Sequence, residues 1–242
     1  MKKSLLIALV LVLVALAVAL MPQDRPAPKT ALTAAEVIAH CAQAMGGISR
    51  IDRLKTLRVG AVYPDHFNRP LYVEIKRPNM SYNPQGQLAF DGKRACFLKG
   101  QGQNSKPEMI DPAELVDFDV EVGYFFPAFF DFPSEYLGTD TVDGLKVHKI
   151  RPKLPHGAEL VYYIDASTWL PYKTRVHMTM RGQSHDTERV FSDYEDVDGI
   201  LYPHGFTYPG RDRKTVVQGR VTSVELNPVL DPAHFTIPEG IK

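Results

Sequence analysis

The sequence predicts an α+β protein in which one strongly curved antiparallel sheet, a half-barrel, holds helices packed on its concave side. Three observations lead to this prediction. Short segments of alternating apolar and polar residues follow one another along most of the chain, and Asp-Gly dipeptides at 91, 143 and 198 interrupt them. One amphipathic helix precedes these segments. A single helix covers a wide sheet only where the sheet curls around it, so we expect a half-barrel.

The N-terminal segment predicts an export signal. Residues 1–3 are Met-Lys-Lys, residues 5–19 are an apolar run, and residues 17–19 (Ala-Val-Ala) have the small-x-small form that signal peptidase recognises. We expect a signal peptide over residues 1–19, and the alternative is that this segment stays as an N-terminal membrane anchor. Residues 20–32, which contain three prolines, are expected to be a linker, and residues 33–242 a single domain.

The charge balance excludes one class of function. Lys plus Arg number 28 and Asp plus Glu number 28, so the formal net charge is zero. A nucleic-acid binder needs a basic excess to neutralise phosphates, and we therefore expect no nucleic-acid partner. Hydrophobic residues make up 44% of the chain, which is ordinary for a globular protein that forms a core.

The first helix is predicted to begin at Thr33, which forms a capping box with Glu36. Gly46 and Gly47 supply a left-handed exit from this helix. A second short helical piece follows, with Ile48, Ile51 and Leu54 expected on one side. The apolar stripe of the first helix consists of Val37, Ile38, Cys41 and Met45.

From residue 57 the apolar period changes to two, which is typical of strands. Type I′ turns are expected at each of the three Asp-Gly dipeptides, and a further turn at residues 165–170. Pro203 is expected to end or bend its strand, or to lie at an edge where no ladder donor is needed. Phe191, Ile200 and Phe206 are the candidates for the apolar side of this segment. The predicted strand segments, with the turns between paired strands, are 57–63, 71–77, 87–100, 142–152, 158–182, 191–208 and 214–228.

An aromatic cluster separates two groups of strands. Asp111, Pro112 and Glu114 predict a helix start before it. Two interpretations remain open for the cluster itself: it fills the core of the half-barrel, or it forms a mobile lid over a cavity, with bends at Pro127 and Pro133. Its members are Tyr124, Phe125, Phe126, Phe129, Phe130 and Phe132.

An ordered set of segments carries a family likeness. Residues 165–171 (DASTWLP), 193–203 (DYEDVDGILYP) and 227–235 (NPVLDPAHF) follow the helix with its Gly-Gly exit. In this order the chain, from about residue 34 to residue 238, resembles the outer-membrane lipoprotein-sorting-protein-like family of the LolA/LolB-like superfamily. The resemblance implies a single LolA-like domain over residues 33–242. It also implies an apolar cavity similar to one that holds the acyl chains of lipoproteins or lipids.

The resemblance and the apolar pattern together suggest which residues line a hydrophobic ligand cavity, although the same residues can equally form the core. Alternation places Met178 and Met180 on one face with Val176, and His177 on the other, so core packing is favoured over a copper site. The candidate cavity residues are Val37, Ile38, Cys41, Met45, Tyr124, Phe125, Phe126, Phe129, Phe130, Met178 and Met180.

No motif in the sequence carries catalytic chemistry. The chain contains no G-x-S-x-G, no H-E-x-x-H and no phosphate-binding glycine loop. We therefore expect no enzyme, no catalytic or metal-binding residues and no cofactor, and residues 184–186 (Ser-His-Asp) are expected in a turn. Cys41 and Cys96 either form one disulfide or remain two buried thiols.

These observations predict a periplasmic, non-enzymatic binding protein for a lipid, a lipoprotein acyl chain or another hydrophobic ligand. Its expected role is transport or sensing in envelope lipoprotein and lipid trafficking, including outer-membrane biogenesis. Its expected partners are a lipid or acylated lipoprotein and a protein of the inner or outer membrane. The alternative is a structural or interaction module with a filled core, which docks an envelope partner through a sheet edge.

Overall fold

The computed structural model describes residues 32–64, 67–85, 87–98, 106–112, 126–155, 159–180, 183–210 and 214–241. Leu32–Lys242 form one compact unit. The helical segments are α2 (Ala34–Ala44), α3 (Ile48–Arg53) and the 3-10 turns η2 (Ala128–Phe130) and η3 (Pro232–Phe235). The strands are β1 (Thr56–Tyr63), β2 (Phe67–Lys76), β3 (Met80–Asn83), β4 (Leu88–Phe90), β5 (Ala95–Phe97), β6 (Glu108–Ile110), β7 (Ser134–Val142), β8 (Leu145–Pro152), β9 (Glu159–Asp165), β10 (Pro171–Met180), β11 (Gln183–Val197), β12 (Ile200–Pro209) and β13 (Val216–Leu226).

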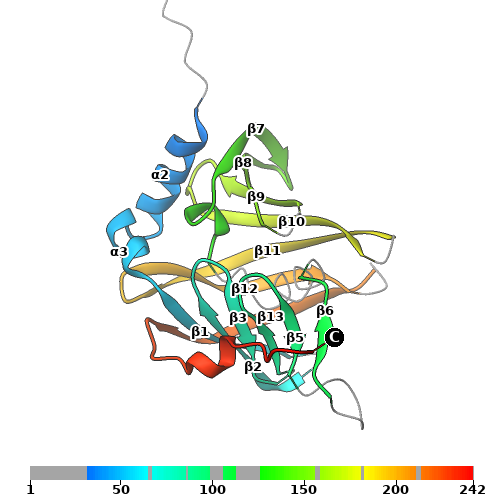
Figure 1. Ribbon diagram of the computed structural model, residues 1–242. Helices are drawn as coiled ribbons and strands as arrows, with labels where there is room; N and C mark the ends of the chain where they lie inside the picture. The colour runs from blue at the N-terminus through cyan, green and yellow to red at the C-terminus, as the bar shows by residue number, and fades with distance from the viewer. Residues whose placement is uncertain are drawn as a thin grey trace, which may run out of the picture. The chain divides into compact units, whose positions relative to one another are not determined.

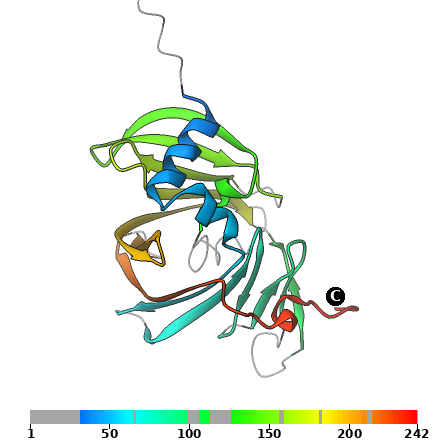
Figure 2. The same ribbon diagram turned by 90° about the vertical axis from the view of Figure 1, so that its left-hand side faces the viewer.

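The strands of the described residues form one antiparallel sheet in the order β6-β5-β4-β3-β2-β1-β13-β12-β11-β10-β9-β8-β7. Strands that follow one another in sequence pair, except β6 and β7, which lie at the two ends of the sheet. β1 also pairs with the last strand, β13, which joins the two halves of the sheet (Figure 1). The sheet curves strongly, and α2 lies over its green strands while α3 leads toward β1 (Figure 2). The predicted fold class, a curved antiparallel sheet with helices on its concave side, is confirmed.

The Asp-Gly turns follow the prediction at two of three positions. At Asp143-Gly144 and Asp198-Gly199 both residues have positive φ, 51° and 80° in the first turn and 50° and 83° in the second, as type I′ requires. Only Gly92 has positive φ in the Asp91-Gly92 turn. There Asp91 Oδ1 accepts hydrogen bonds from the backbone N–H groups of the two residues after Gly92, so a wider loop forms. The type I′ prediction for this hairpin is therefore wrong.

Helix α2 begins as predicted, with the Thr33–Glu36 capping box formed in both directions. Met45 caps its C-terminus, and Gly46 and Gly47 leave the helix with φ of 116° and 98°. In α3 and just after it, Ile51 and Leu54 are buried, but Ile48 is 51% exposed because it begins the helix on the solvent side. The expectation that all three share one buried side is therefore wrong for Ile48.

The main core lies between the helices and the sheet. Val37, Cys41 and Met45 of the helix belong to one buried cluster with inward residues of the strands. The strand members include Leu57, Val59, Ile150, Leu160, Tyr162, Ile164 and Val176. Both cysteines are free and buried, and Cys96 lies in a separate cluster with Tyr82 and Phe235, so the structure favours two buried thiols over a disulfide. In the part of the chain that the structure describes, no helix is long and apolar enough to cross a membrane.

A stack of three aromatic rings connects α2 to the sheet. The imidazole of His40 stacks on Trp169 with the ring centroids 4.4 Å apart, and Trp169 stacks on His148 at 4.6 Å. The Nδ1 atom of His148 is 2.9 Å from the hydroxyl oxygen of Tyr136. His148 is buried, and its pKa is lowered, first by burial and then by the charges of Lys146 and His40.

This lowered pKa predicts an acid-sensitive contribution to stability. An unfolded histidine binds a proton near pH 6.5, whereas the folded His148 resists protonation, so the unfolded chain gains protons first as pH falls. The contribution of His148 is therefore full above about pH 6.5 and is lost as pH falls from there through the folded pKa. Urea unfolding at pH 7.5 and pH 5.5 checks this. We expect His148→Phe, which keeps a ring against Trp169, to lose less stability on acidification than the parent. Equal losses in the two proteins would contradict the prediction.

Candidate functional site

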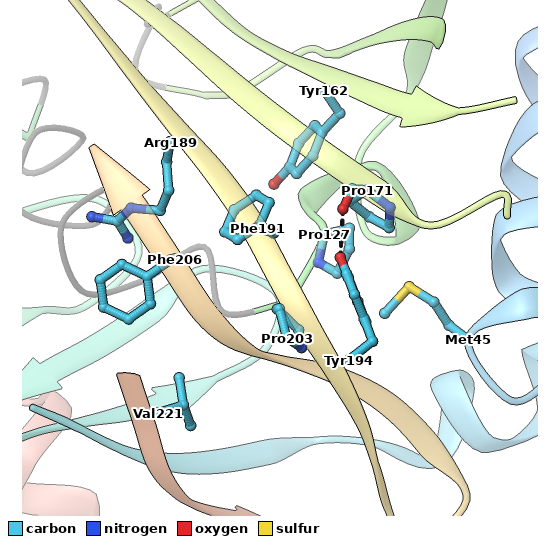
Figure 3. Close-up of a pocket in the computed structure, with 10 residues that line it drawn as sticks. All are labelled: Met45, Pro127, Tyr162, Pro171, Arg189, Phe191, Tyr194, Pro203, Phe206 and Val221. Carbon is cyan, nitrogen blue, oxygen red and sulfur yellow. Dashed lines mark hydrogen bonds between the residues drawn. The ribbon is translucent and has the colours of Figure 1, made fainter. Parts of the chain in front are cut away.

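A cavity lies between the C-terminal end of α2 and the central strands of the sheet. Its wall is apolar except for one arginine and two tyrosine hydroxyls (Figure 3). The residues that line it are Met45, Pro127, Tyr162, Pro171, Arg189, Phe191, Tyr194, Pro203, Phe206 and Val221. It therefore joins residues from the helix end, from the segment before η2 and from strands β9 to β13.

The cavity forms where two neighbouring strands separate. β12 pairs with β13 only from Gly205 to Pro209, whereas β13 pairs with β1 from Arg220 to Leu226. The first half of β12 is thus not paired with β13, and the backbone N–H of Leu201 instead donates a hydrogen bond to the carbonyl oxygen of Met45 at 3.0 Å. Pro203 lies in this half of β12 and pairs only with β11, at Tyr194. Of the three predicted roles for Pro203, the local edge that needs no ladder donor is the one observed.

An irregularity in β11 gathers three side chains on the cavity. Strict alternation would place Arg189 and Phe191 on one face and Tyr194 on the other. Asp193 has φ of 51°, which interrupts the alternation, and all three side chains line the same cavity. Gly205 faces this kink across the ladder, and a Cβ atom there would lie 2.2 Å from Ser192 Oγ and 2.4 Å from Asp193 Oδ2, so those two side chains would have to move.

The tyrosine hydroxyls of the cavity wall are used for structure. The hydroxyl of Tyr162 accepts a hydrogen bond from the backbone N–H of Ala128 at 3.0 Å, which fixes η2 to β9. The hydroxyl of Tyr194 donates to the carbonyl oxygen of Pro171 at 2.6 Å, as Figure 3 shows. Burial raises the pKa of both phenols, so both stay neutral at physiological pH.

Arg189 is the charged residue of the wall and is only 3% exposed. The carbon of its guanidinium lies 4.9 Å from the ring centre of Phe206 and 5.5 Å from that of Tyr208. Cation–π contacts of this kind stabilise a guanidinium that is removed from water. The cavity wall is therefore apolar, with one buried guanidinium beside two aromatic rings.

The cavity is small. About 30 Å³ admits the centre of a water-sized sphere, which corresponds to roughly two water molecules. The empty space between the lining residues, counted out to open solvent, is about 490 Å³. Small-molecule sites commonly measure about 300–1,000 Å³, so a ligand of that size requires the part that opens to solvent.

The structure places the candidate cavity residues in several environments. Met45 lines the cavity. Val37, Cys41, Phe126 and Phe129 are buried in the main core cluster, and Ile38 and Phe130 pack against it. Met178 and Met180 belong to β10, whose side chains are described only as far as His177. Tyr124 and Phe125 lie outside the described residues, as does Glu114 of the predicted helix start, whereas Asp111 and Pro112 are described.

Sequence reasoning did not single out most of the cavity wall. Arg189, Tyr162, Pro171 and Val221 come from four different strands, and only the folded sheet brings them together. One signal was present for Arg189. The period of two puts Arg189 on the same face as Phe191, which the pattern already assigns to the apolar side.

Residues 184–186 (Ser-His-Asp), whose residue types could serve as nucleophile and base, do not line the cavity. Ser184 and Asp186 belong to β11 and pair with Thr179 and His177 of β10. The expectation of a turn at residues 184–186 is therefore wrong. The reason is that the two long strands stay paired nearly to their ends. His177 Nδ1 lies 3.1 Å from Asp186 Oδ1, and both side chains are exposed. Among the described residues, no group of three His, Cys, Asp or Glu side chains is placed to hold a metal ion.

Comparison with known proteins relates the chain to others through its fold. No protein-family model matches the sequence. No curated protein matches it either. A crystal structure of a LolA superfamily protein from Nitrosomonas europaea is similar, with a TM-score of 0.56 and 14% identity, over 86% of this chain and 99% of that one. A DUF1329 family protein from Desulfovibrio piger gives a TM-score of 0.49 and 14% identity, over 83% and 97% of the two chains. The first of these similarities confirms the LolA-like fold that the sequence resemblance implies.

Proposed function

From this LolA-like fold, we propose that the chain is a binding protein for a hydrophobic or acylated ligand, which it holds in the cavity between α2 and β9–β13. The observation that carries the proposal is the apolar wall, to which prolines, aromatic rings, Met45 and Val221 contribute. The similarity to a LolA superfamily protein supports it at the level of the fold.

The size of the cavity defines how such a ligand is held. The cavity has room for only one end of such a ligand, and we expect the rest of its apolar chain to lie toward the side that opens to solvent. Burying a methylene group contributes about 0.8 kcal/mol, so a chain of about ten methylenes supplies about 8 kcal/mol before the costs of ordering. After the costs of ordering the ligand are subtracted, the remaining free energy is sufficient for binding without many polar contacts.

The proposed location is the periplasm, reached through the signal peptide expected over residues 1–19. The proposed role is non-enzymatic, in envelope lipoprotein or lipid trafficking or sensing. Its partners would be a lipid or an acylated lipoprotein and a membrane protein that delivers or receives it. Mass spectrometry of the chain, gently purified from the periplasm, is expected to show a co-purifying lipid.

A pair of valine variants tests whether the cavity is the site. Val221 is 2% exposed and lines the cavity, whereas Val216 on the same strand is 64% exposed. We expect the parent to bind the neutral apolar dye phenylnaphthylamine, measured by its fluorescence. Val221→Phe should weaken this binding by at least about tenfold, because the added ring fills the cavity. Val216→Phe should leave it unchanged.

A second variant keeps the test decisive if Val221→Phe does not fold. Phe191→Ala removes a ring from the wall and is expected to admit more dye. The absence of dye binding in the parent and in Phe191→Ala, together with no co-purifying lipid, would overturn the proposed function.

The interaction module remains a second candidate, and the small cavity, in which about 30 Å³ admits the centre of a water-sized sphere, favours it. β7 is an end strand of the sheet in the described residues and pairs there only with β8. Its outer edge can therefore accept a strand from a partner. This candidate predicts that neither the parent nor any cavity variant binds the dye.

A further inference from the structure

The three stacked rings at α2 come from three separate elements. His40 belongs to α2, Trp169 to the turn between β9 and β10, and His148 to β8. The two imidazoles stack on one indole, with interplanar angles of 24° for His40 and 7° for His148. The helix is thus connected to the sheet through two residues whose side chains can bind a proton.

Trp169 adopts a backbone conformation that a large side chain rarely occupies. Its φ is 60°, in the left-handed region. Its backbone N–H donates a hydrogen bond to the carbonyl oxygen of Asp165 at 2.8 Å. Such residues keep their conformation where the surrounding structure imposes it, and they cluster at ligand clamps and switch regions. Loss of the stack removes one of the contacts that impose this conformation on Trp169.

The surroundings of His148 oppose its protonation. Burial lowers the pKa of His148 most, followed by the positive charges of Lys146 on the same strand and of His40 on α2. From β7, the hydroxyl oxygen of Tyr136 lies 2.9 Å from Nδ1 of His148. An imidazolium gains a cation–π contact with an indole, but burial and the two positive neighbours act against this gain.

Two carboxylates of the same elements are engaged locally. Asp165 Oδ1 accepts hydrogen bonds from the backbone N–H groups of Ser167 and Thr168, within the turn that carries Trp169. Glu36 closes the capping box of α2, and its charge interacts with that of His40 on the same helix. A proton on His148 is therefore accommodated better when the ring leaves the stack and reaches water.

Helix α2 connects the stack to the cavity. Met45 follows His40 by five residues, about 7.5 Å along a helix axis, and lines the cavity. Cys41, which follows His40 directly, donates a hydrogen bond from its thiol to the Sδ atom of Met45 at 3.8 Å. A movement of α2 away from the sheet therefore moves part of the cavity wall.

We propose that His40, Trp169 and His148 form an acid-sensitive latch, which holds α2 on the sheet at neutral pH and releases it when His148 binds a proton. Release of the latch moves Met45 and lowers the affinity of the cavity for its ligand. The effect on the ligand rests on the proposed function, whereas the latch itself does not.

The sign of the pH dependence follows from the two states of His148. In the released form its pKa is near the ordinary 6.5, above that of the buried form, so acid favours release. At pH 5 one such proton changes the equilibrium between the two forms by at most about thirtyfold.

Tryptophan fluorescence tests the latch without any ligand. Trp169 is the only tryptophan of the chain, so its emission reports on the stack. As the pH falls from 7.5 to 5, we expect the emission of the parent to shift to longer wavelength, because water reaches the indole. Circular dichroism should stay unchanged, since the sheet remains folded. An unchanged emission, or a loss of the sheet signal over the same pH range, would overturn the latch.

Two substitutions assign the shift to His148. His148→Phe keeps a ring that cannot bind a proton, and the shift should disappear. His177→Gln replaces an exposed histidine of β10 outside the stack and should titrate like the parent. A shift that persists in His148→Phe would overturn the assignment.

His40→Ala provides an independent test if His148→Phe does not fold. His40 is exposed, so the variant is expected to fold. It removes one ring of the stack and one positive charge that acts on His148. The midpoint of the emission change should therefore move to higher pH, toward 6.5. An unchanged midpoint would show that His40 is not part of the latch.

The affinity for phenylnaphthylamine at pH 7.5 and pH 5 tests the link to the cavity. We expect the parent to bind this neutral dye about three- to thirtyfold more weakly at pH 5, and His148→Phe to differ by less than about twofold. Equal affinity of the parent at both pH values would overturn control of the cavity by the latch. If the dye binds at neither pH, the proposed function fails, and the emission of Trp169 still decides the latch.

Discussion

Gly46→Ala is expected to destabilise the fold by about 4 kcal/mol, the sum of a backbone and a steric cost. Gly46 has φ of 116°, a conformation that favours glycine. A Cβ atom at this position would lie 1.9 Å from the carbonyl oxygen of Gly199, so the helix end or the β11–β12 turn must move. Because that oxygen belongs to the backbone, no side-chain rotation relieves the clash.

Gly47→Ala is the matched control for this variant. Gly47 also has positive φ, at 98°, but a Cβ atom there would meet nothing within 4 Å. Gly47→Ala should therefore lower the free energy of unfolding only by the cost of the backbone conformation, about 2 kcal/mol. Urea unfolding of both variants measures the difference, and failure of Gly46→Ala alone to fold would agree with the expectation. Equal stabilities would show that α2 does not depend on its close approach to Gly199.

The same variant links stability to the site. Met45 precedes Gly46, lines the cavity and accepts the hydrogen bond from Leu201. Any displacement that accommodates a Cβ atom at residue 46 moves this part of the wall. We therefore expect folded Gly46→Ala to bind phenylnaphthylamine more weakly than Gly47→Ala.

Arg77→Ala is expected to lower the free energy of unfolding by about 3–5 kcal/mol, the range for breaking a buried ion pair. The side chain of Arg77 is 8% exposed, and its Nε and Nη2 atoms each donate to a carboxylate oxygen of Asp131 at 2.8 Å. Its Nη1 atom donates to the carbonyl oxygen of Leu54 at 2.8 Å, and the guanidinium lies over the ring of Phe126 at 4.9 Å. Arg77 thus connects the end of α3, the segment after η2 and the sheet.

An exposed arginine with two carboxylate partners provides the control. Arg151 lies 2.8 Å from Glu135 and 2.6 Å from Glu159, but its side chain is 35% exposed. Solvent screens such pairs, and Arg151→Ala should cost at most about 1 kcal/mol. Chemical denaturation of both variants checks the comparison. A loss for Arg77→Ala no larger than that for Arg151→Ala would contradict a structural role for the buried pair.

Local patterns in the sequence were sufficient to predict the helix ends and most of the turns. The Thr33–Glu36 box, the Gly46-Gly47 exit and two of the three Asp-Gly turns depend only on neighbours within a few residues, and each forms as predicted. The turn at Asp91 differs because a carboxylate can satisfy backbone donors in more than one loop geometry. The curvature of the sheet followed from counting one helix against many strands.

The same local patterns predicted less of the candidate site. Alternation assigns a residue to a face of its strand, but it does not say which part of that face is filled. Phe191 and Phe206 were assigned to the apolar side, and the structure adds that they line a cavity together with Arg189. The positive φ of Asp193, which turns Tyr194 to the same side, has no unambiguous sequence signature.

By itself, the sequence determined the order of helix and strands, the fold class and the balance of charge, because these depend on local periodicity and composition. Only the tertiary structure decided where the cavity lies and that a buried arginine forms part of its wall. The reason is that β13 leaves β12 to pair with β1, and this separation of strands depends on pairing between residues more than 150 positions apart in the chain, such as Leu57 and Leu226.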